Sequence, residues 1–345
     1  MVQWTTGNIG TKSVHAIVQN AHLELVGCYA WSKEKVGRDA GELAGIAPLG
    51  VTATDDVDAL LALEPDCVVY NAQFADVDHL VRILESGINI VTTSEFITGH
   101  RLGEGRERVI EACRRGRATI FGSGLNPGFI QLFAIVSAGL SDRVDRVRIV
   151  ESFDTTIYNS PETEKIMGFG YPIDHPGLLS VTEEGSGIFR EAVLVVADAL
   201  GADLDEIRCD ATYAAATEDV YLPGDWVIEK GCVAGIDVSW RGFVGDRDVV
   251  EVRAVWTKGQ ALEPLWEMGF GYDIIVEGRP TIKTTLAFEP PADFVAETIE
   301  EYILLGLTIT AVPAITAIPA VVAAAPGIAT YNDLPLFLPR GVLSA

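Results

Sequence analysis

Short apolar runs alternate with helix-like periodicity along the first 125 residues. Five runs predict buried strands, at residues 2–4, 23–30, 66–70, 88–92 and 118–121. The intervening stretches show the spacing of amphipathic helices, at residues 10–19, 57–63, 77–86 and 105–115. Apolar strands that alternate with helices indicate a parallel sheet with right-handed crossovers.

Past Asn126 the pattern changes to longer, partly alternating strands. They are predicted at residues 147–153, 249–257, 272–277 and 281–288, with helices at 130–140 and 187–200. The predicted fold class is therefore α/β, with a Rossmann-type parallel sheet domain and an α+β domain whose sheet is open and mixed or antiparallel. We expect a dinucleotide-binding domain over 1–128 and a substrate and dimerisation domain over 129–306. Residues 307–345 are expected to pack back between them.

The stretch 303–332 carries no charge and is long enough to cross a bilayer. It contains Pro313, Pro319 and Pro326, and no Lys or Arg lies close to its ends. We therefore predict a helix that starts near Thr310, has Pro313 in its first turn and is buried on all sides, and no membrane partner.

Composition narrows the class of protein. Lys and Arg number 25 against 49 Asp and Glu, so the net charge is −24, which disfavours nucleic acid and anionic membrane as partners. Five cysteines without a CxxC pair, and no clustered histidines, indicate neither a disulfide framework nor a metal site. No signal peptide precedes the first strand, so a cytoplasmic protein is predicted.

A glycine-containing turn follows the first strand. It reads TTGNIG, where Gly7 allows a phosphate to approach the backbone and Gly10 allows the next helix to pack on the strand. The first glycine of the usual pattern is missing, and Trp4 is taken to stand in its place. The predicted contacts to a dinucleotide pyrophosphate are Thr6, Gly7, Asn8, Ile9 and Gly10.

The second strand ends near Trp31, Ser32 and Lys33. The tip continues with Glu34 and Lys35, and its hydroxyl and cations favour NADP(H), with NAD(H) as an alternative. An ordinary solvated loop is the other interpretation of this segment.

Three further segments end or follow strands at the edge where ligands of such sheets bind. These predicted cofactor contacts could each also be simple turns. They are Asn71, Ala72, Thr93, Ser94, Asn126 and Pro127.

Glu95 follows the same strand as Thr93 and Ser94. A carboxylate beside the cofactor can act as a general base or acid, whereas a Glu near a helix start only complements the helix dipole. Position alone leaves both interpretations open.

Residues 153–177 form a long segment of aromatic and turn residues, typical of a pocket wall. The segment has no Arg, the residue that normally binds a substrate carboxylate. We therefore predict an apolar or weakly polar substrate. For His175 a structural role is the alternative. The predicted pocket residues are Phe153, Met167, Phe169, Tyr171 and His175.

Taken together, TTGNIG, YNAQ, VTTSEF, GSGLNPGF and the run TAVPAITAIPAVVAAAPGIATYNDLP resemble the dihydrodipicolinate reductase-like superfamily. More closely, they resemble its branch of 2,4-diaminopentanoate dehydrogenases and native amine dehydrogenases. The chain lacks the paired-His motif and Lys-rich stretch of true dihydrodipicolinate reductases.

The resemblance implies reversible reductive amination of small aliphatic or cyclic ketones or aldehydes with ammonia and NAD(P)H. It implies that Glu95 is the catalytic carboxylate. Independently of the resemblance, the open sheet predicted for the second domain has one face to cover, which predicts a homodimer. Three alternatives stay open on the same fold: a carbonyl reductase, a diamino acid dehydrogenase and a non-catalytic dinucleotide sensor.

Overall fold

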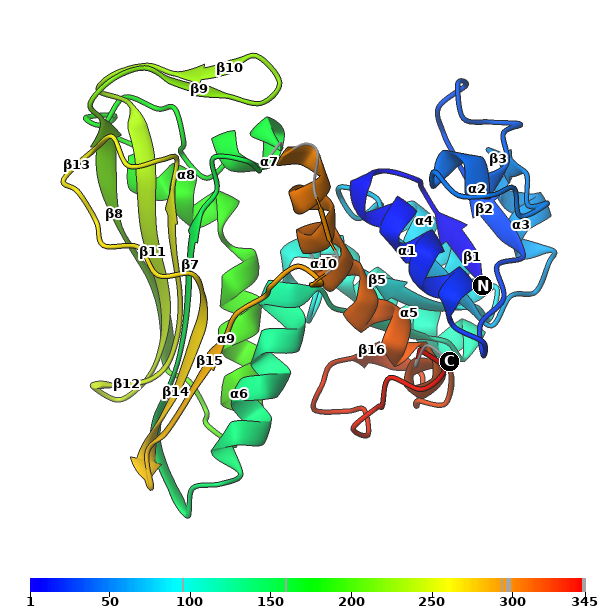
Figure 1. Ribbon diagram of the computed structural model, residues 1–345. Coiled ribbons are helices and arrows are strands. Elements are labelled where there is room, and N and C mark those ends of the chain that lie inside the picture. The colour runs from blue at the N-terminus through cyan, green and yellow to red at the C-terminus, as the bar shows by residue number, and fades with distance from the viewer. Residues whose placement is uncertain (95, 159, 293, 296–298, 343–345) are drawn as a thin grey trace. The chain divides into compact units, whose positions relative to one another are not determined.

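A computed structural model describes residues 1–94, 96–158, 160–292, 294–295 and 299–342 (Figure 1). The chain divides into two compact units. One comprises Met1–Phe129 and Leu304–Ala345, and the other comprises Ile130–Ile303. Each is described by itself below.

The first unit is built on a seven-stranded sheet with the order β16-β6-β5-β4-β1-β2-β3. Every recorded pairing in it is parallel. Strand order reverses beside β1, so the carboxyl ends of β1 and β4 flank the switch point where ligands bind in such sheets. Its strands are β1 (Val2–Trp4), β2 (Gly27–Tyr29), β3 (Ala53–Thr54), β4 (Cys67–Tyr70), β5 (Asn89–Thr92), β6 (Thr119–Gly122) and β16 (Gly327–Ala329).

Helices connect these strands, as apolar strands in a parallel sheet require. Leu80, Ile83 and Leu84 of α4 are fully buried against the sheet residues. Gly87, which follows this helix, has φ +83, the left-handed conformation that ends helices. The helices are α1 (Asn8–Gln19), α2 (Ala40–Leu43), α3 (Val57–Leu61), α4 (Val77–Glu85) and α5 (Gly105–Gly116), with a short 3-10 turn η1 at His100–Leu102.

The long helix α10 (Ile299–Val322) corrects two expectations. It starts eleven residues before Thr310, so Pro313 lies inside it and not in its first turn. It is also not buried all round, because only 44% of the apolar window Leu305–Val322 is buried. By length and composition that window could cross a membrane, yet its buried residues Ala311, Ala314, Ile315 and Ile318 share the spacing of a core-facing stripe. After it, β16 extends the first unit's sheet beside β6.

The second unit is a seven-stranded mixed sheet with the order β13-β8-β11-β12-β7-β14-β15. Only β7 and β12 pair in parallel, and the other recorded pairs are antiparallel. Its strands are β7 (Arg143–Asp154), β8 (Glu206–Ala216), β11 (Val233–Val244), β12 (Arg247–Thr257), β13 (Leu262–Glu263), β14 (Gly271–Arg279) and β15 (Ile282–Leu286), with a separate hairpin of β9 (Val220–Leu222) and β10 (Trp226–Ile228).

Helices cover one face of this sheet (Figure 1). They are α6 (Ile130–Ala138), α8 (Leu178–Gly185) and α9 (Ile188–Ala199), and the short helix α7 (Pro161–Lys165) precedes α8 in the chain. The other face carries a ladder of half-buried ion pairs, in which Arg146 and Arg148 both bond Glu251. Dimerisation through this unit stays a prediction.

Candidate functional site

The turn after β1 has the backbone that the sequence pattern requires, with one correction. The residue with left-handed backbone is Thr5, at φ +72, whereas Trp4 is the last residue of the strand. The missing first glycine is therefore replaced by Thr5 and not by Trp4. Thr5 is β-branched, which makes this conformation unusual, and its hydroxyl donates to the carbonyl of Asn71 at 3.0 Å.

Gly10 and Gly7 serve different needs in this turn. A Cβ at Gly10 would collide with the Thr5 carbonyl, so glycine lets α1 start close to the strand. A Cβ at Gly7 would meet nothing within 4 Å, so the space beside it is open.

The same turn fits a dinucleotide phosphate. Gly7 caps α1 with no side-chain hydrogen bond, and the first turn of the helix has no acidic residue. The buried Thr6 hydroxyl has no hydrogen-bond partner among the described residues. Free helix N–H groups, positive dipole potential and an unpaired hydroxyl are what a pyrophosphate group would use.

The loop after β2 contains two of the predicted cations, Lys33 and Lys35, in different environments. Lys35 is half-buried, and its Nζ donates to the Thr6 carbonyl at 2.7 Å, directly at the phosphate turn. By contrast, Lys33 is exposed and Trp31 is 75% exposed. Ser32 is half-buried and its carbonyl accepts from the N–H of Lys35, so the loop folds back toward the turn.

Side-chain amides link the ends of three adjacent strands. Buried Gln3 of β1 donates to Asn71 Oδ1 at 2.8 Å, and Asn71 Nδ2 donates to Thr93 Oγ1 at 2.9 Å. Ser94 Oγ donates to the carbonyl of Ala72. The structure thus brings together Asn71, Ala72, Thr93 and Ser94, the residues predicted after β4 and β5. Gln3 is the member that sequence reasoning missed, because a polar residue inside a three-residue strand gave no pattern.

Glu95 lies outside the described residues. Its neighbours in the chain, Ser94 and Phe96, are 1% and 2% exposed. A Cβ at Gly122, the last residue of β6, would collide with the Phe96 carbonyl, so the segment after β5 lies against the end of β6.

The crossover after β6 is anchored from the far end of the chain. Ser123 Oγ lies 2.6 Å from the hydroxyl of Tyr331, and burial raises the pKa of that phenol well above its usual value. Asn126 and Pro127 are half-buried and joined by a cis peptide bond in the turn Leu125–Phe129. Tyr331 was not predicted, since nothing in the sequence indicated which strand end it would contact.

The predicted pocket residues all belong to the second unit, at separate places within it. Tyr171 and His175 form an edge-to-face pair with ring centroids 5.1 Å apart. Phe153, at the end of β7, packs on Phe270 and Tyr272.

The middle of the same segment is tied to the interior of the second unit. Phe169 is 1% exposed, so it belongs to the interior packing. Met167 is half-buried, and its carbonyl accepts from the Thr182 hydroxyl at 2.8 Å.

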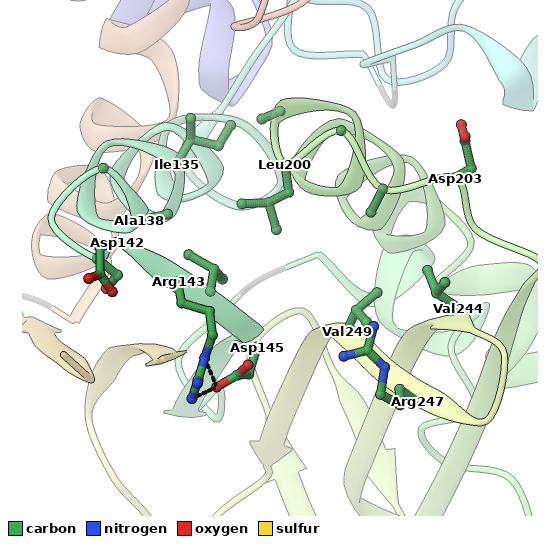
Figure 2. Close-up of a pocket in the computed structure, with 16 residues that line it drawn as sticks. Ile135, Ala138, Asp142, Arg143, Asp145, Leu200, Asp203, Val244, Arg247 and Val249 are labelled. Atoms are coloured by element: carbon green, nitrogen blue, oxygen red, sulfur yellow. Dashed lines mark hydrogen bonds and ion pairs between the residues drawn. The ribbon is translucent and has the colours of Figure 1, made fainter. Parts of the chain in front are cut away.

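A groove of about 740 Å³ lies at the opposite end of the second unit's helices (Figure 2). It is lined by the ends of α6 and α9 and by the β11–β12 connection, and the Arg143–Asp145 ion pair lies within it. None of the predicted site residues lines this groove.

Comparison with known proteins decides the family. The model of the 2,4-diaminopentanoate dehydrogenase C-terminal domain matches residues 130–344. An amine dehydrogenase from Streptomyces virginiae is 30% identical over 83% of this chain and 84% of its own. The chain belongs to the 2,4-diaminopentanoate dehydrogenase and amine dehydrogenase branch. It is therefore an oxidoreductase.

Further matches agree with this family and fold. Residues 1–105 match the N-terminal domain of dihydrodipicolinate reductase. The structure of an amine dehydrogenase from Mycobacterium smegmatis has a TM-score of 0.79 and 21% identity, covering 99% of this chain and 97% of that one. A Bordetella pertussis dehydrogenase solved with NADH and UDP-GlcNAcA has a TM-score of 0.50 and 14% identity, covering 93% of this chain and 86% of that one. The predicted α/β fold, a Rossmann-type domain plus a mixed-sheet domain, is confirmed.

Proposed function

We propose that this protein is an NAD(P)H-dependent amine dehydrogenase. It would convert small aliphatic or cyclic ketones or aldehydes and ammonia into primary amines, reversibly. The observation that carries the proposal is Glu95, an acidic residue three positions after β5 in a chain whose phosphate turn fits a dinucleotide. The amine dehydrogenase relative from Streptomyces virginiae supports the same reaction class.

The reduced nicotinamide supplies the hydride when the cofactor is bound. The chain's own contribution is binding, orientation and proton transfer. The N-terminus of α1, Thr6 and Lys35 would hold the phosphates. Asn71, fixed between Gln3 and Thr93, presents a rigid amide at the switch point of the sheet.

Glu95 would move the protons of the amination. Its carboxylate takes a proton from ammonium, which frees the nitrogen lone pair to attack the carbonyl carbon. Within the addition product one proton moves from the nitrogen to the alkoxide oxygen, and the protonated Glu95 then gives its proton to the resulting hydroxyl, which leaves as water. The remaining carboxylate charge stabilises the iminium cation that accepts the hydride.

The substrate class follows from the wall at 153–177. Its basic residues are Lys165 and His175 only, and it contains no Arg. Because a substrate carboxylate would normally be bound by Arg, we propose substrates without one. The cofactor is proposed to be NADP(H), with NAD(H) also accepted.

A diamino acid dehydrogenase is the second candidate, because the matching family model is named for 2,4-diaminopentanoate. The missing Arg argues against it, since that substrate carries a carboxylate. A carbonyl reductase would instead use Tyr171 or His175 as its acid, and these two side chains are already paired with one another.

The deciding experiment follows NADPH oxidation with cyclohexanone in ammonium chloride and in an equal concentration of potassium chloride. An amine dehydrogenase consumes NADPH only with ammonium and forms cyclohexylamine. Equal rates in both salts would mean carbonyl reduction. Oxidation of 2,4-diaminopentanoate with no turnover of simple amines would mean the diamino acid enzyme.

A further inference from the structure

The second unit contains a fully buried lysine. Lys258 directly follows β12, has no exposed surface, and donates its backbone N–H to the Ala234 carbonyl at 2.7 Å. Its Nζ donates to the carbonyl of Thr155 at 2.7 Å and is ion-paired with Glu164. A charge in such a place is rare unless it is paired and hydrogen-bonded.

Several parts of the chain meet at this ammonium. Thr155 directly follows β7, and Glu164 lies on α7. The ring of Phe169 lies 5.4 Å from Nζ, and the ring of Trp226, on β10, lies 5.6 Å from it. Aromatic faces attract a cation, so the group is surrounded by partners from β7, α7, the turn after α7 and the β9–β10 hairpin.

The segment held by this cluster has little regular structure of its own. Among the described residues between β7 and α8 the only helix is α7, of five residues, and Gly168 and Gly170 have φ +110 and +80. The same segment includes Met167, Phe169 and Tyr171, three of the predicted pocket residues. Its path therefore depends on side-chain contacts, and Lys258–Glu164 is the most buried ion pair in the part of the chain that the structure describes.

A hydrophobic pair could fill this space with less desolvation, so stability alone does not account for a buried salt bridge. Directional bonds do something that apolar packing does not: they fix which residues meet and in what geometry.

We propose that Lys258 and Glu164 are positioning residues that lock residues 155–158 and 160–171 onto the sheet, and so shape the wall that receives the carbon skeleton of the substrate. This inference rests on the proposed function for the substrate. Neither residue is assigned a part in proton or hydride transfer.

The test compares single and double replacements in the full-length protein. Lys258→Met leaves the Glu164 carboxylate buried without its cationic partner, and Glu164→Leu leaves the Lys258 ammonium buried without its anionic partner. The double variant E164L/K258M removes both charges together and keeps the volume filled. Exposed Lys283 and Glu162 provide the matched controls K283M and E162L.

Two readouts are measured for each variant. Hydrogen exchange of peptides over 155–171 is expected to speed up in both single variants, while exchange in the first unit is unchanged. The KM for ketone is expected to rise on the order of ten- to a hundredfold, with a smaller change in kcat and an unchanged dinucleotide Kd. In the double variant both readouts should return toward those of the wild type.

Three results would overturn the lock. The double variant could remain as impaired as Lys258→Met, which would assign a direct role to the lysine charge. Both single variants could exchange and bind like the controls. Dinucleotide affinity could fall in parallel with ketone affinity, which would indicate a general loss of structure. Since hydrogen exchange needs no turnover, it tests the lock even if the wild type fails to aminate ketones.

Discussion

The phosphate turn of the first unit and the Lys258 cluster of the second unit treat polar groups in opposite ways. At the turn, Gly7 faces open space, α1 has no side-chain cap and the buried Thr6 hydroxyl has no partner among the described residues. In the cluster, the buried Lys258 ammonium is bonded to Glu164 and Thr155 and faces two aromatic rings. The first arrangement leaves donors available to a ligand, whereas the second uses them within the chain.

The difference separates a binding site from a scaffold. Unpaired N–H donors at a helix N-terminus cost little free energy, because water solvates them. They contribute binding free energy only when an anion is bound. A buried ammonium without a partner would be costly at all times, so the chain itself must satisfy it. Substitutions in the turn should therefore change ligand affinity, and substitutions in the cluster should change the order of the wall.

Gly10→Val should have the largest effect of the changes in the turn. Its side chain would collide with the Thr5 carbonyl, so we expect a loss of about 3 kcal/mol in unfolding free energy and much weaker dinucleotide binding. Gly7→Ala is the matched control, because its Cβ enters open space at φ −78. It should keep wild-type stability in thermal unfolding and lose affinity for the dinucleotide in calorimetry. An unaffected affinity would remove the open space at Gly7 from the phosphate site.

The charged pair in the second unit should give a pH-dependent stability. Burial raises the pKa of Glu164 to about 6, against the opposing effect of Lys258, and burial lowers the pKa of Lys258. Since the folded chain holds the Glu164 proton more tightly than the unfolded chain, this stabilising contribution is full below about pH 4.5 and is lost as the pH rises through about 6. Relative to E164L/K258M, the wild type should lose about 2 kcal/mol between these limits in denaturant unfolding.

Asp154 also acts electrostatically on Lys258, and Tyr158 interacts with Glu164; the double variant keeps both residues. The difference between the two proteins therefore isolates Glu164 and Lys258. A pH-independent difference would show that the pair does not titrate in this range.

Two lysines after β2 allow a sharper test of the turn. Lys35→Met should weaken the binding of NADPH and of NADH alike by about tenfold, since Lys35 lies at the Thr6 carbonyl. Lys33→Met should have little effect on either affinity.

Ser32→Asp should weaken the binding of NADPH more than that of NADH, because a carboxylate there repels a 2′-phosphate. Equal effects of Ser32→Asp on both cofactors would contradict the 2′-phosphate interpretation.

Thr5 should give the smallest effect. Thr5→Gly relieves the left-handed strain but loses the bond to Asn71 and adds chain entropy, so we expect a change within about 0.5 kcal/mol. Thr5→Val keeps the strain and loses the bond, and should cost about 1 kcal/mol in thermal unfolding. Because both variants lose the bond, equal stabilities of the two would mean that the left-handed strain at residue 5 does not affect stability.

The sequence predicted the first unit well because each strand there is an apolar run between helices. It missed β3, which has only two residues, and β16, whose three residues join the sheet at the open edge of β6. It also missed β8 and β11, since their outward residues, such as Asp210 and Arg241, form ion pairs across strands and interrupt the apolar pattern.

For the site, the sequence predicted the strand ends but not the bonds between them. Asn71 and Thr93 were placed by the rule for parallel sheets, whereas Gln3, Lys35 and Tyr331 act through contacts with residues distant in the chain. The role of Lys258 was equally hidden, because a lysine after a strand is ordinarily exposed. Local periodicity predicts helices and strands, but it does not predict which polar groups pair across long distances in the chain.

The most direct test of the central claim is the turnover of Glu95→Gln with ketone, ammonium and NADPH, measured beside its dinucleotide Kd. The account predicts a loss in kcat on the order of 10² to 10⁴ with an unchanged Kd, and wild-type behaviour of the exposed control Glu104→Gln. Ammonium-dependent turnover of Glu95→Gln at the wild-type rate would contradict it.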